Sequence, residues 1–331
     1  MLSRVADNLY WMSRYLERAE HTARLLDVSL HQMLDHSTQE EQPRWQRLRA
    51  SLSTPATDDK IDSSYSITEL FTFETSTPTS IGYSIAAARE NARQVREQIS
   101  SEMWEQINRL YLQIRQTSID ELWFAKPHVF FSNVKEGVQL FQGITDATMN
   151  HSEGWHFIRV GKFIERASAT ATLIDVHFQT FFESELADIQ ATIDHLNYYQ
   201  DWVGLLRSCA SFEAYCKVYT AAQIRPERIA EFLLFNPESP RSIRFAAGML
   251  QAGLQSIARA TRTRRPGRIE RLAGRLRSAL EYDQVEDVIQ DVHAYLENIQ
   301  RQCSQIHKAI YQGYMDYPIE VVLAERASRQ A

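Results

Sequence analysis

The feature that most constrains how this chain can fold is a charged helical segment that occurs twice, 148 residues apart. Residues 17–28 and 165–176 are identical at eight of twelve positions, and each segment begins with Glu-Arg-Ala. A repeated segment of this kind indicates that an ancestral unit was duplicated. We therefore predict two divergent halves, residues 1–150 and 151–331, that pack together as one unit.

Two further blocks recur in the same order along the chain. The stronger block has Glu, Phe, Pro, Ser and Ile at positions 69, 73, 78, 80 and 81, and again at positions 231, 235, 240, 242 and 243. A weaker block matches Trp45, Leu48 and Ser51 to Trp202, Leu205 and Ser208. In the stronger block we expect Thr77 and Ser239 to be helix N-caps, with the prolines in the first turn.

The composition favours helices almost throughout. The chain of 331 residues contains only 11 Gly and 9 Pro, and its long runs are rich in Ala, Leu, Glu, Gln and Arg, which are good helix formers. The apolar share of 44% is enough for a sizeable core. No stretch has a convincing strand pattern. We therefore predict an all-α fold, a helical bundle built from two divergent halves.

Charge and cysteine content argue against several classes of protein. A net charge of −6 and a pI near 6.0 disfavour general affinity for nucleic acids. Cys209, Cys216 and Cys303 form neither a disulfide framework nor a metal-binding pattern, so we expect reduced thiols. We find no signal sequence and no apolar run of about 18 residues that could span a membrane. We expect a soluble, cytoplasmic protein.

The repeated Glu-Arg pairs allow two interpretations. Neighbouring residues on a helix point about 100° apart, so Glu17 and Arg18 must each reach a different neighbouring helix. In the structural interpretation the two halves pack about a pseudo-twofold axis, and Glu17 pairs with Arg166 while Arg18 pairs with Glu165. In the functional interpretation these residues line a cleft that binds a substrate or a partner protein.

The functional interpretation adds residues around each pair. His21 lies one turn after Glu17, and Arg14 lies three residues before it, so the first half offers an acid, a base and a cation on one helix face. Glu17, Arg18, His21 and Arg14 are therefore the candidate catalytic residues. The second half has Ala in place of His21, but it retains candidate binding residues at Lys162, Glu165 and Arg166.

Two other polar groups are candidates for binding. Glu90, Asn91 and Arg93 form a polar cluster that is also explained by a solvated helix face. Glu153 and His156 have the Glu-x-x-His spacing of carboxylate-bridged di-metal bundles. Such centres need the motif twice, and we find it once. We therefore expect no metal site, and we keep both residues as binding candidates.

The segment from Arg259 to Arg277 is strongly basic. It contains Arg259, Arg262, Arg264, Arg265, Arg268, Arg271, Arg275 and Arg277. Such a segment could bind phosphate, an acidic protein or RNA, although aromatic residues are not interleaved and a solvated surface explains it equally well. We find no glycine-rich phosphate loop, no catalytic triad and no context for a nucleophilic cysteine.

Residues 8–24, 88–93 and 153–157 closely resemble the bacterial Alpha-E family. That family is a predicted all-helical domain named for a Glu-Arg motif, which matches Glu17-Arg18 and again Glu165-Arg166. Its genes typically lie beside, or are fused to, circularly permuted ATP-grasp proteins, often with transglutaminase-like proteins and sometimes with a proteasome-like peptidase. The resemblance covers nearly the whole chain.

The resemblance implies a role in an ATP-grasp amidoligase system that makes or attaches a small peptide. The chain would be a helical partner or co-catalytic subunit without a cofactor of its own, because ATP and Mg²⁺ would bind to the ligase. Its other partners would be a peptide or amino-acid substrate and possible transglutaminase-like proteins.

Two alternatives stay open. One is a stand-alone enzyme in which Glu17 and His21 act as acid and base and Arg14, Arg18 or Arg93 clamps an anion. The other is an RNA-binding module at Arg259 to Arg277.

Overall fold

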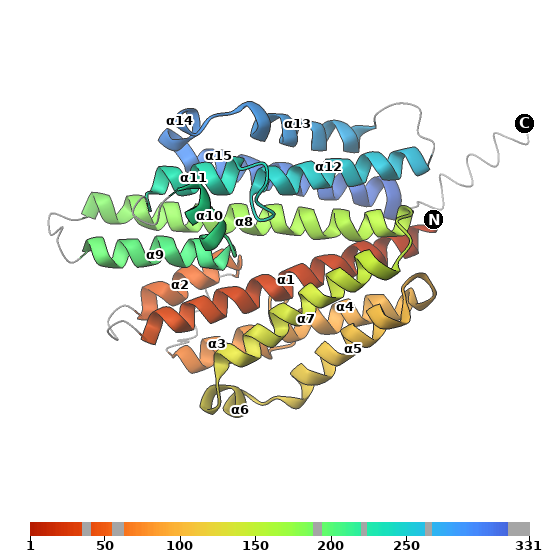
Figure 1. Ribbon diagram of the computed structural model, residues 1–331, viewed down its shortest axis with the longest axis horizontal. Helices are drawn as coiled ribbons and strands as arrows, with labels where there is room; N and C mark the ends of the chain where they lie inside the picture. The colour runs from red at the N-terminus through yellow and green to blue at the C-terminus, as the bar shows by residue number, and fades with distance from the viewer. Residues whose placement is uncertain (35–40, 55–62, 188–193, 220–223, 262–266, 317–331) are drawn as a thin grey trace, which may run out of the picture.

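The computed structural model describes residues 1–34, 41–54, 63–187, 194–219, 224–261 and 267–316. These residues form helices and connecting turns, and none of them is in a strand, which confirms the predicted all-α class. Figure 1 shows an elongated bundle in which the longest helices lie side by side.

The helices follow one another along the chain, and the predicted boundary near residue 150 divides them into two groups. Residues before position 150 form α1 (Ser3–Leu34), α2 (Glu41–Ser51), α3 (Ser64–Thr72), α4 (Ile81–Gln94), a 3-10 turn (Arg96–Gln98), α5 (Ser101–Gln116), α6 (Ile119–Phe124) and α7 (Pro127–Thr148). After it come α8 (Glu153–Ala187), α9 (Asp194–Ser208), α10 (Phe212–Val218), α11 (Pro226–Phe235), α12 (Ile243–Ala260), α13 (Arg268–Tyr282), α14 (Val285–Val288), a 3-10 turn (Ile289–Asp291), α15 (Val292–Ile310) and a π-helical turn (Tyr311–Met315).

The centre of the bundle is the pair of long helices α1 and α8, which pack along each other (Figure 1). Helices α4 and α7 cover α1, and α12 and α15 cover α8. Helix α5 then packs on α4 and α7, just as α13 packs on α12 and α15. The buried apolar side chains form one cluster that runs through both halves. The predicted boundary near residue 150 lies in the turn between α7 and α8.

Helices α1 and α8 touch backbone to backbone where they cross. The Ser13 hydroxyl of α1 donates a hydrogen bond of 2.6 Å to the Ile158 carbonyl of α8. At the same crossing, a Cβ atom added to Gly161 would lie 2.3 Å from the Tyr10 carbonyl oxygen. Only glycine permits this approach. The close crossing brings the charged side chains of both helices within reach of one another.

The predicted N-caps of α4 and α12 are wrong by three residues. The helices begin at Ile81 and Ile243, and their N-caps are Ser80 and Ser242 instead of Thr77 and Ser239. Each capping hydroxyl accepts a 3.0 Å hydrogen bond from the backbone N–H three residues later and donates one of 2.5 Å to a carbonyl six residues earlier. The second bond explains the shift, because it depends on the folded loop and not on the local spacing.

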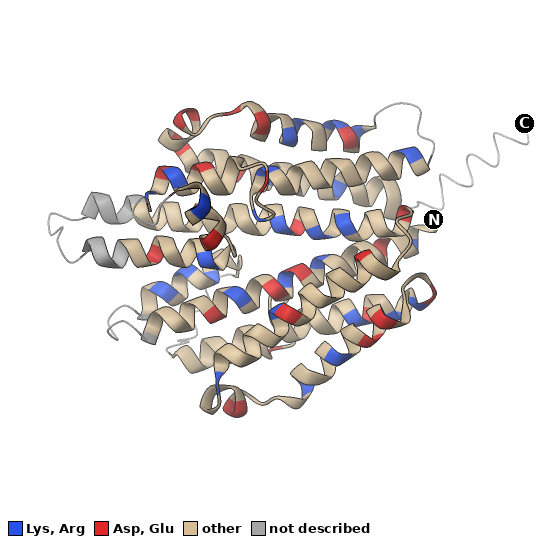
Figure 2. Ribbon diagram, viewed as in Figure 1, with Lys and Arg blue, Asp and Glu red and all other residues tan. Residues whose placement is uncertain are grey.

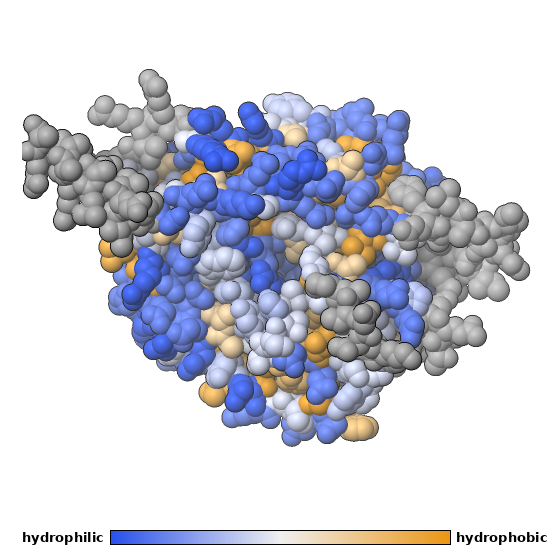
Figure 3. Space-filling model, turned by 180° about the vertical axis from the view of Figure 1, so that it is seen from behind, coloured by the Kyte–Doolittle hydropathy of each residue, from blue (hydrophilic) through white to orange (hydrophobic). Residues whose placement is uncertain are grey.

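The surface seen in Figure 3 is mostly hydrophilic, with hydrophobic residues in small, separate patches. Within the described ranges, no helix combines the length and apolarity that crossing a membrane requires. The three cysteines are free, as predicted from their spacing.

Candidate functional site: a buried Glu-Arg network beside a cationic pocket

Glu17 lies at the centre of a buried ion network between α1 and α8. Its two carboxylate oxygens accept hydrogen bonds of 2.6 and 2.8 Å from Nε and Nη2 of Arg166, which is a bidentate pair. Nη1 of Arg241, which precedes α12, also donates to Glu17 at 3.1 Å. Glu17 is only 2% exposed. Figure 2 shows acidic and basic residues on both α1 and α8 near the middle of the bundle.

The second Glu-Arg pair is held in a similar way. Glu165 accepts a hydrogen bond of 2.7 Å from Nε of Arg14 on one oxygen and another of 2.7 Å from Nε of Arg18 on the other. Both cross-pairs of the structural interpretation, Glu17 with Arg166 and Arg18 with Glu165, are therefore confirmed. The Glu-Arg motif joins the two central helices by reciprocal ion pairs.

The network extends to residues that the sequence analysis did not single out. Glu20 is fully buried and accepts hydrogen bonds from Arg24, at 2.7 Å, and from Arg241. The spacing of Glu20 and Arg24, one helical turn apart, is a local signal that could have indicated this pair. Arg241 gave no such signal, because it comes from a loop more than 200 residues away in the sequence.

The arginines keep the buried carboxylates ionised. Burial raises the pKa of Glu17, but Arg166 and Arg241 outweigh it and hold that pKa below its usual range. The same balance, with Arg14 and Arg18, lowers the pKa of Glu165 to about 2. Burial, reinforced by Arg241, lowers the pKa of His21 to about 4, so this imidazole is neutral near pH 7. Ionised carboxylates paired with arginines, beside a neutral histidine, are suited to holding the helices together and poorly suited to proton transfer.

A pocket of about 440 Å³ borders the network. It lies between α1, α7, α8 and α12 and is lined by Ser13, Leu16, Phe141, Gln142, Thr145, Asp146, His151, Trp155, Ile158, Arg159, Lys162, Phe163, Phe245 and Met249. Gln142 connects it to the network, since its amide donates to Glu17 at 3.4 Å and accepts from Lys162 Nζ at 2.7 Å.

Two cations of the pocket have no ion-pair partner within the described part of the chain. Lys162 is partly buried, and burial, with Arg166 nearby, lowers its pKa to about 8. The Arg159 guanidinium lies 4.5 Å from the centre of the Trp155 ring. The acid of the pocket, Asp146, accepts a 3.0 Å hydrogen bond from the Trp155 indole and forms no ion pair with either cation. The pocket therefore has positive charge available for a ligand.

The position of Lys162 explains why it is unpaired. Lys162 of α8 corresponds to Arg14 of α1, 148 residues earlier, and Arg14 is paired with Glu165. The corresponding acid for Lys162 is Glu17, whose oxygens are already held by two arginines. Of the predicted site residues, Lys162 is thus the one that the structure leaves facing a pocket with its charge unpaired.

The remaining predicted site residues lie outside the network and the pocket. Glu90 and Arg93 pair with each other at 2.7 Å and are exposed, and the Asn91 amide donates to a backbone carbonyl of its own helix. Glu153 accepts a 3.0 Å hydrogen bond from the chain's N-terminal ammonium group. His156 is partly buried, and burial lowers its pKa. The binding roles of these residues stay predictions.

The structure also places the basic segment and the possible metal ligands. The described arginines of the segment, Arg259, Arg268, Arg271, Arg275 and Arg277, are exposed, while Arg262, Arg264 and Arg265 lie outside the described residues. Glu153 and His156 do not belong to a potential metal-binding group in the described part of the chain. Asp27, His31 and His128 do form such a group.

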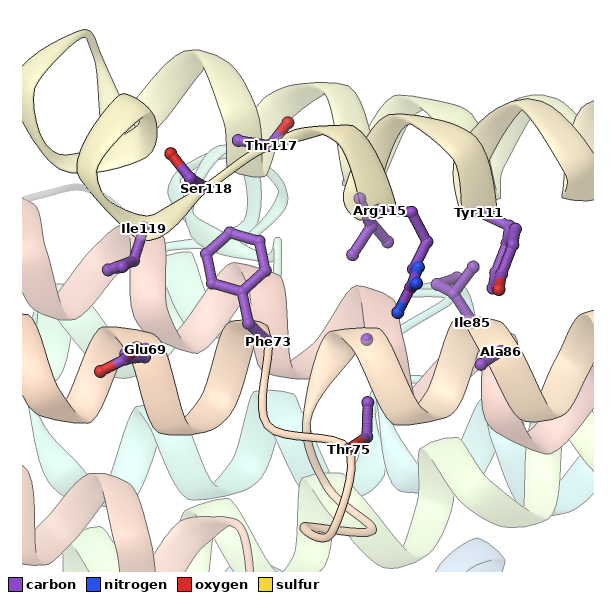
Figure 4. Close-up of a pocket in the computed structure, with 12 residues that line it drawn as sticks. Glu69, Phe73, Thr75, Ile85, Ala86, Tyr111, Arg115, Thr117, Ser118 and Ile119 are labelled. Carbon is purple, nitrogen blue, oxygen red and sulfur yellow. The ribbon is translucent and has the colours of Figure 1, made fainter.

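A second pocket, of about 390 Å³, lies between α3, α4 and α5 (Figure 4). Phe73 and Ile85 line it, and the Arg115 guanidinium points into it from α5. It shares no lining residue with the Glu-Arg network. Arg115 therefore provides a cation in a pocket with which Lys162 can be compared.

The fold and the paired motifs define an all-helical domain whose two central helices are joined by two Glu-Arg pairs. Residues 1–315 match the model of the Alpha-E family, described as a predicted alpha-helical domain with a conserved ER motif, and the chain belongs to this family. It is 25% identical over 312 residues to "Uncharacterized protein Mb2597" of Mycobacterium bovis and to "Uncharacterized protein Rv2567" of Mycobacterium tuberculosis. Each match covers 87% of this chain and 34% of the relative. The chain thus spans about a third of the length of these relatives. No solved structure matches it.

Proposed function

We propose that this chain is the substrate-holding helical subunit of an ATP-grasp amidoligase system that makes or attaches a small peptide. The observation that carries the proposal is the pocket beside the Glu-Arg network, where Lys162 and Arg159 lack carboxylate partners among the described residues. The link to an ATP-grasp ligase comes from the resemblance to the Alpha-E family. ATP and Mg²⁺ bind to the ligase in this proposal.

The pocket suits a peptide or amino acid that carries a carboxylate. Lys162 and Arg159 supply charge for the carboxylate, and the rings of Trp155, Phe163 and Phe245 supply an apolar surface for a side chain. A volume of about 440 Å³ is in the range of small-molecule sites. The network itself holds no substrate, because its carboxylates and arginines are occupied with one another. Its role is to hold α1 and α8 so that the pocket keeps its shape.

We further propose that the two halves are divergent copies of one unit. Equivalent N-caps at Ser80 and Ser242 have the same geometry, and equivalent helices make equivalent contacts. In this view the second copy lost an ion pair at Lys162 and so acquired the pocket.

A stand-alone enzyme with Glu17 and His21 as acid and base has less support from the geometry. Glu17 is buried and held by two arginines, and His21 is a weak base with a pKa of about 4. Product formation by the purified chain without a ligase would favour this alternative. Binding of RNA by Arg259 to Arg277 also stays a prediction.

The substrate proposal is tested by calorimetric titration with a short aromatic peptide that has a free C-terminal carboxylate, and with its C-terminal amide. We expect the free peptide to bind at least about tenfold more tightly, which corresponds to about 1.4 kcal/mol. Lys162→Gln should remove this preference. Arg115→Gln, which removes the cation of the other pocket, should keep it. Equal binding of both peptides, or binding of neither, would contradict the proposal.

The pocket should also show a characteristic pH dependence. Lys162 has a lowered pKa of about 8, so it loses its proton as the pH rises through 8, while a bound carboxylate favours the protonated form. We expect the affinity for the free peptide to fall above pH 8. Lys162→Arg, which stays charged throughout, should bind without this decline. An unchanged pH profile in that variant would show that another group is responsible.

The partner proposal is tested separately, by co-purification with a circularly permuted ATP-grasp protein of the kind whose genes typically lie beside those of the Alpha-E family. ATP consumption and product mass should be measured with each protein alone and with both together. We expect a product only when both are present. If the two proteins neither associate nor affect each other's activity, the ligase partnership is wrong, whatever the peptide titration shows.

A further inference from the structure

A second site lies at the other end of α1 from the Met1 terminus, where two imidazoles and a carboxylate meet. Asp27 and His31 lie one turn apart on α1, and His128 comes from the first turn of α7. Their potential ligand atoms all lie within 4.8 Å of one another. Nδ1 of His128 lies 2.8 Å from Oδ1 of Asp27. Nδ1 of His31 lies 3.0 Å from the backbone carbonyl oxygen of Asp27 and 3.6 Å from the same Oδ1, and its Nε2 has no such partner on Asp27. Imidazole and carboxylate groups are the usual ligands of Zn²⁺ and related divalent ions.

A lysine of α7 holds the Asp27 carboxylate in position. Asp27 is buried, and its other oxygen, Oδ2, accepts a 2.5 Å hydrogen bond from the Lys135 ammonium group of α7. This contact leaves Oδ1 directed at the imidazoles. The His31 and His128 side chains are 52% and 57% exposed, so an ion can reach them from solvent and keep a water ligand.

The second half of the chain contains a matched site without the third ligand. There Nδ1 of His293 lies 2.7 Å from Oδ1 of Asp175, and Gln300 donates to Oδ2 at 3.4 Å. Asp175 corresponds to Asp27, and the residue one turn later is Gln179 instead of a histidine. Gln179 donates to Oδ1 of Asp175 at 3.3 Å. The Asp-His contact therefore serves as a tie between helices in both halves, and only the first of these two sites adds a second imidazole.

We propose that Asp27, His31 and His128 bind a divalent transition-metal ion of the Zn²⁺ class, through two imidazole nitrogens and one carboxylate oxygen. Water completes the coordination shell. The ion links α1 to the start of α7. This site is independent of the proposed substrate pocket and lies apart from Glu153 and His156. It departs from our expectation, made from the amino-acid sequence, that the chain has no metal site.

The test uses the full chain without a polyhistidine tag, titrated with Co²⁺ as a visible probe and with Zn²⁺ by calorimetry. We expect one equivalent of metal to bind and the thermal midpoint to rise when Zn²⁺ is present. His31→Gln introduces the residue of the matched site and should weaken binding by at least about tenfold. His293→Gln, at the matched site, should bind metal like the unmodified chain.

A third variant tests the effect of the positive charge beside Asp27. Lys135→Gln introduces the residue found at position 300 and removes a positive charge beside the proposed ion, so it should strengthen metal binding several-fold. The proposal is overturned if the chain binds no stoichiometric metal, if His31→Gln binds as tightly as the unmodified chain, or if His293→Gln weakens binding as much as His31→Gln does.

Discussion

Glu17 and Lys162 show that the ion-pair partners within reach determine what a charged residue can do. Glu17 accepts hydrogen bonds from two arginines, one on α8 and one in the loop before α12. It is therefore ionised although buried, and it contributes to the packing of the helices. Lys162 is near the same carboxylate but does not pair with it, and its charge remains available in the pocket. We therefore assign the proposed binding role to Lys162, a neighbour of the Glu-Arg motif, and not to the motif itself.

At this scale we predict that Glu17→Gln destabilises the protein by about 3–5 kcal/mol, because it leaves Arg166 buried without its counter-charge. Arg18→Gln should cost far less, since Arg18 is partly exposed and Arg14 still holds Glu165. Urea unfolding measures both values. In a double-mutant cycle, adding Arg166→Gln to Glu17→Gln should cost less than the sum of the single changes. Additive costs would mean that the two residues do not depend on each other.

At the scale of elements, the crossing of α1 and α8 determines where the charged residues meet. Gly161 lets the helices touch, and Ser13 bonds across the same crossing. Both Glu-Arg pairs join α1 to α8, so a wider separation of these helices would weaken both pairs together.

We expect Gly161→Ala to lower the free energy of unfolding by about 1–3 kcal/mol, because the new Cβ atom meets backbone that cannot move aside freely. Gly143→Ala in α7 is the matched control. Its Cβ atom would have no neighbour within 4 Å, so alanine should stabilise that helix by about 0.5–1 kcal/mol. Thermal unfolding of the two variants tests the expected opposite signs. Destabilisation of similar size in both would argue against a special role for the crossing.

At the scale of the whole molecule, the two halves share their interior. Helices α1 and α2 belong to the first half and both contact α8 of the second half. Helix α1 also contacts α9. A single apolar cluster includes residues from Ala6 to Ile310. The residues before and after the predicted boundary at position 150 therefore do not form separate cores.

We predict that the chain unfolds in one cooperative transition. Differential scanning calorimetry should give equal calorimetric and van't Hoff enthalpies. Glu17→Gln, which alters a pair between the halves, should shift this single transition to lower temperature without splitting it. Two resolved transitions in the unmodified chain would show that the halves unfold separately.

The helical class could be predicted from the amino-acid sequence, whereas the reciprocal pairing of the two Glu-Arg motifs was one of two interpretations that the sequence left open. The helical class depends on local information, because helix propensity and the 3.6-residue period decide which segments form helices and which side chains share a face. The other features of the site arise from tertiary contacts. Arg241 reaches Glu17 and Glu20 from a distant loop, Lys162 lines a pocket without forming an ion pair, and His128 joins Asp27 and His31 from another helix. These outcomes depend on which residues far apart in the chain compete for the same partners, and no local pattern carries that information.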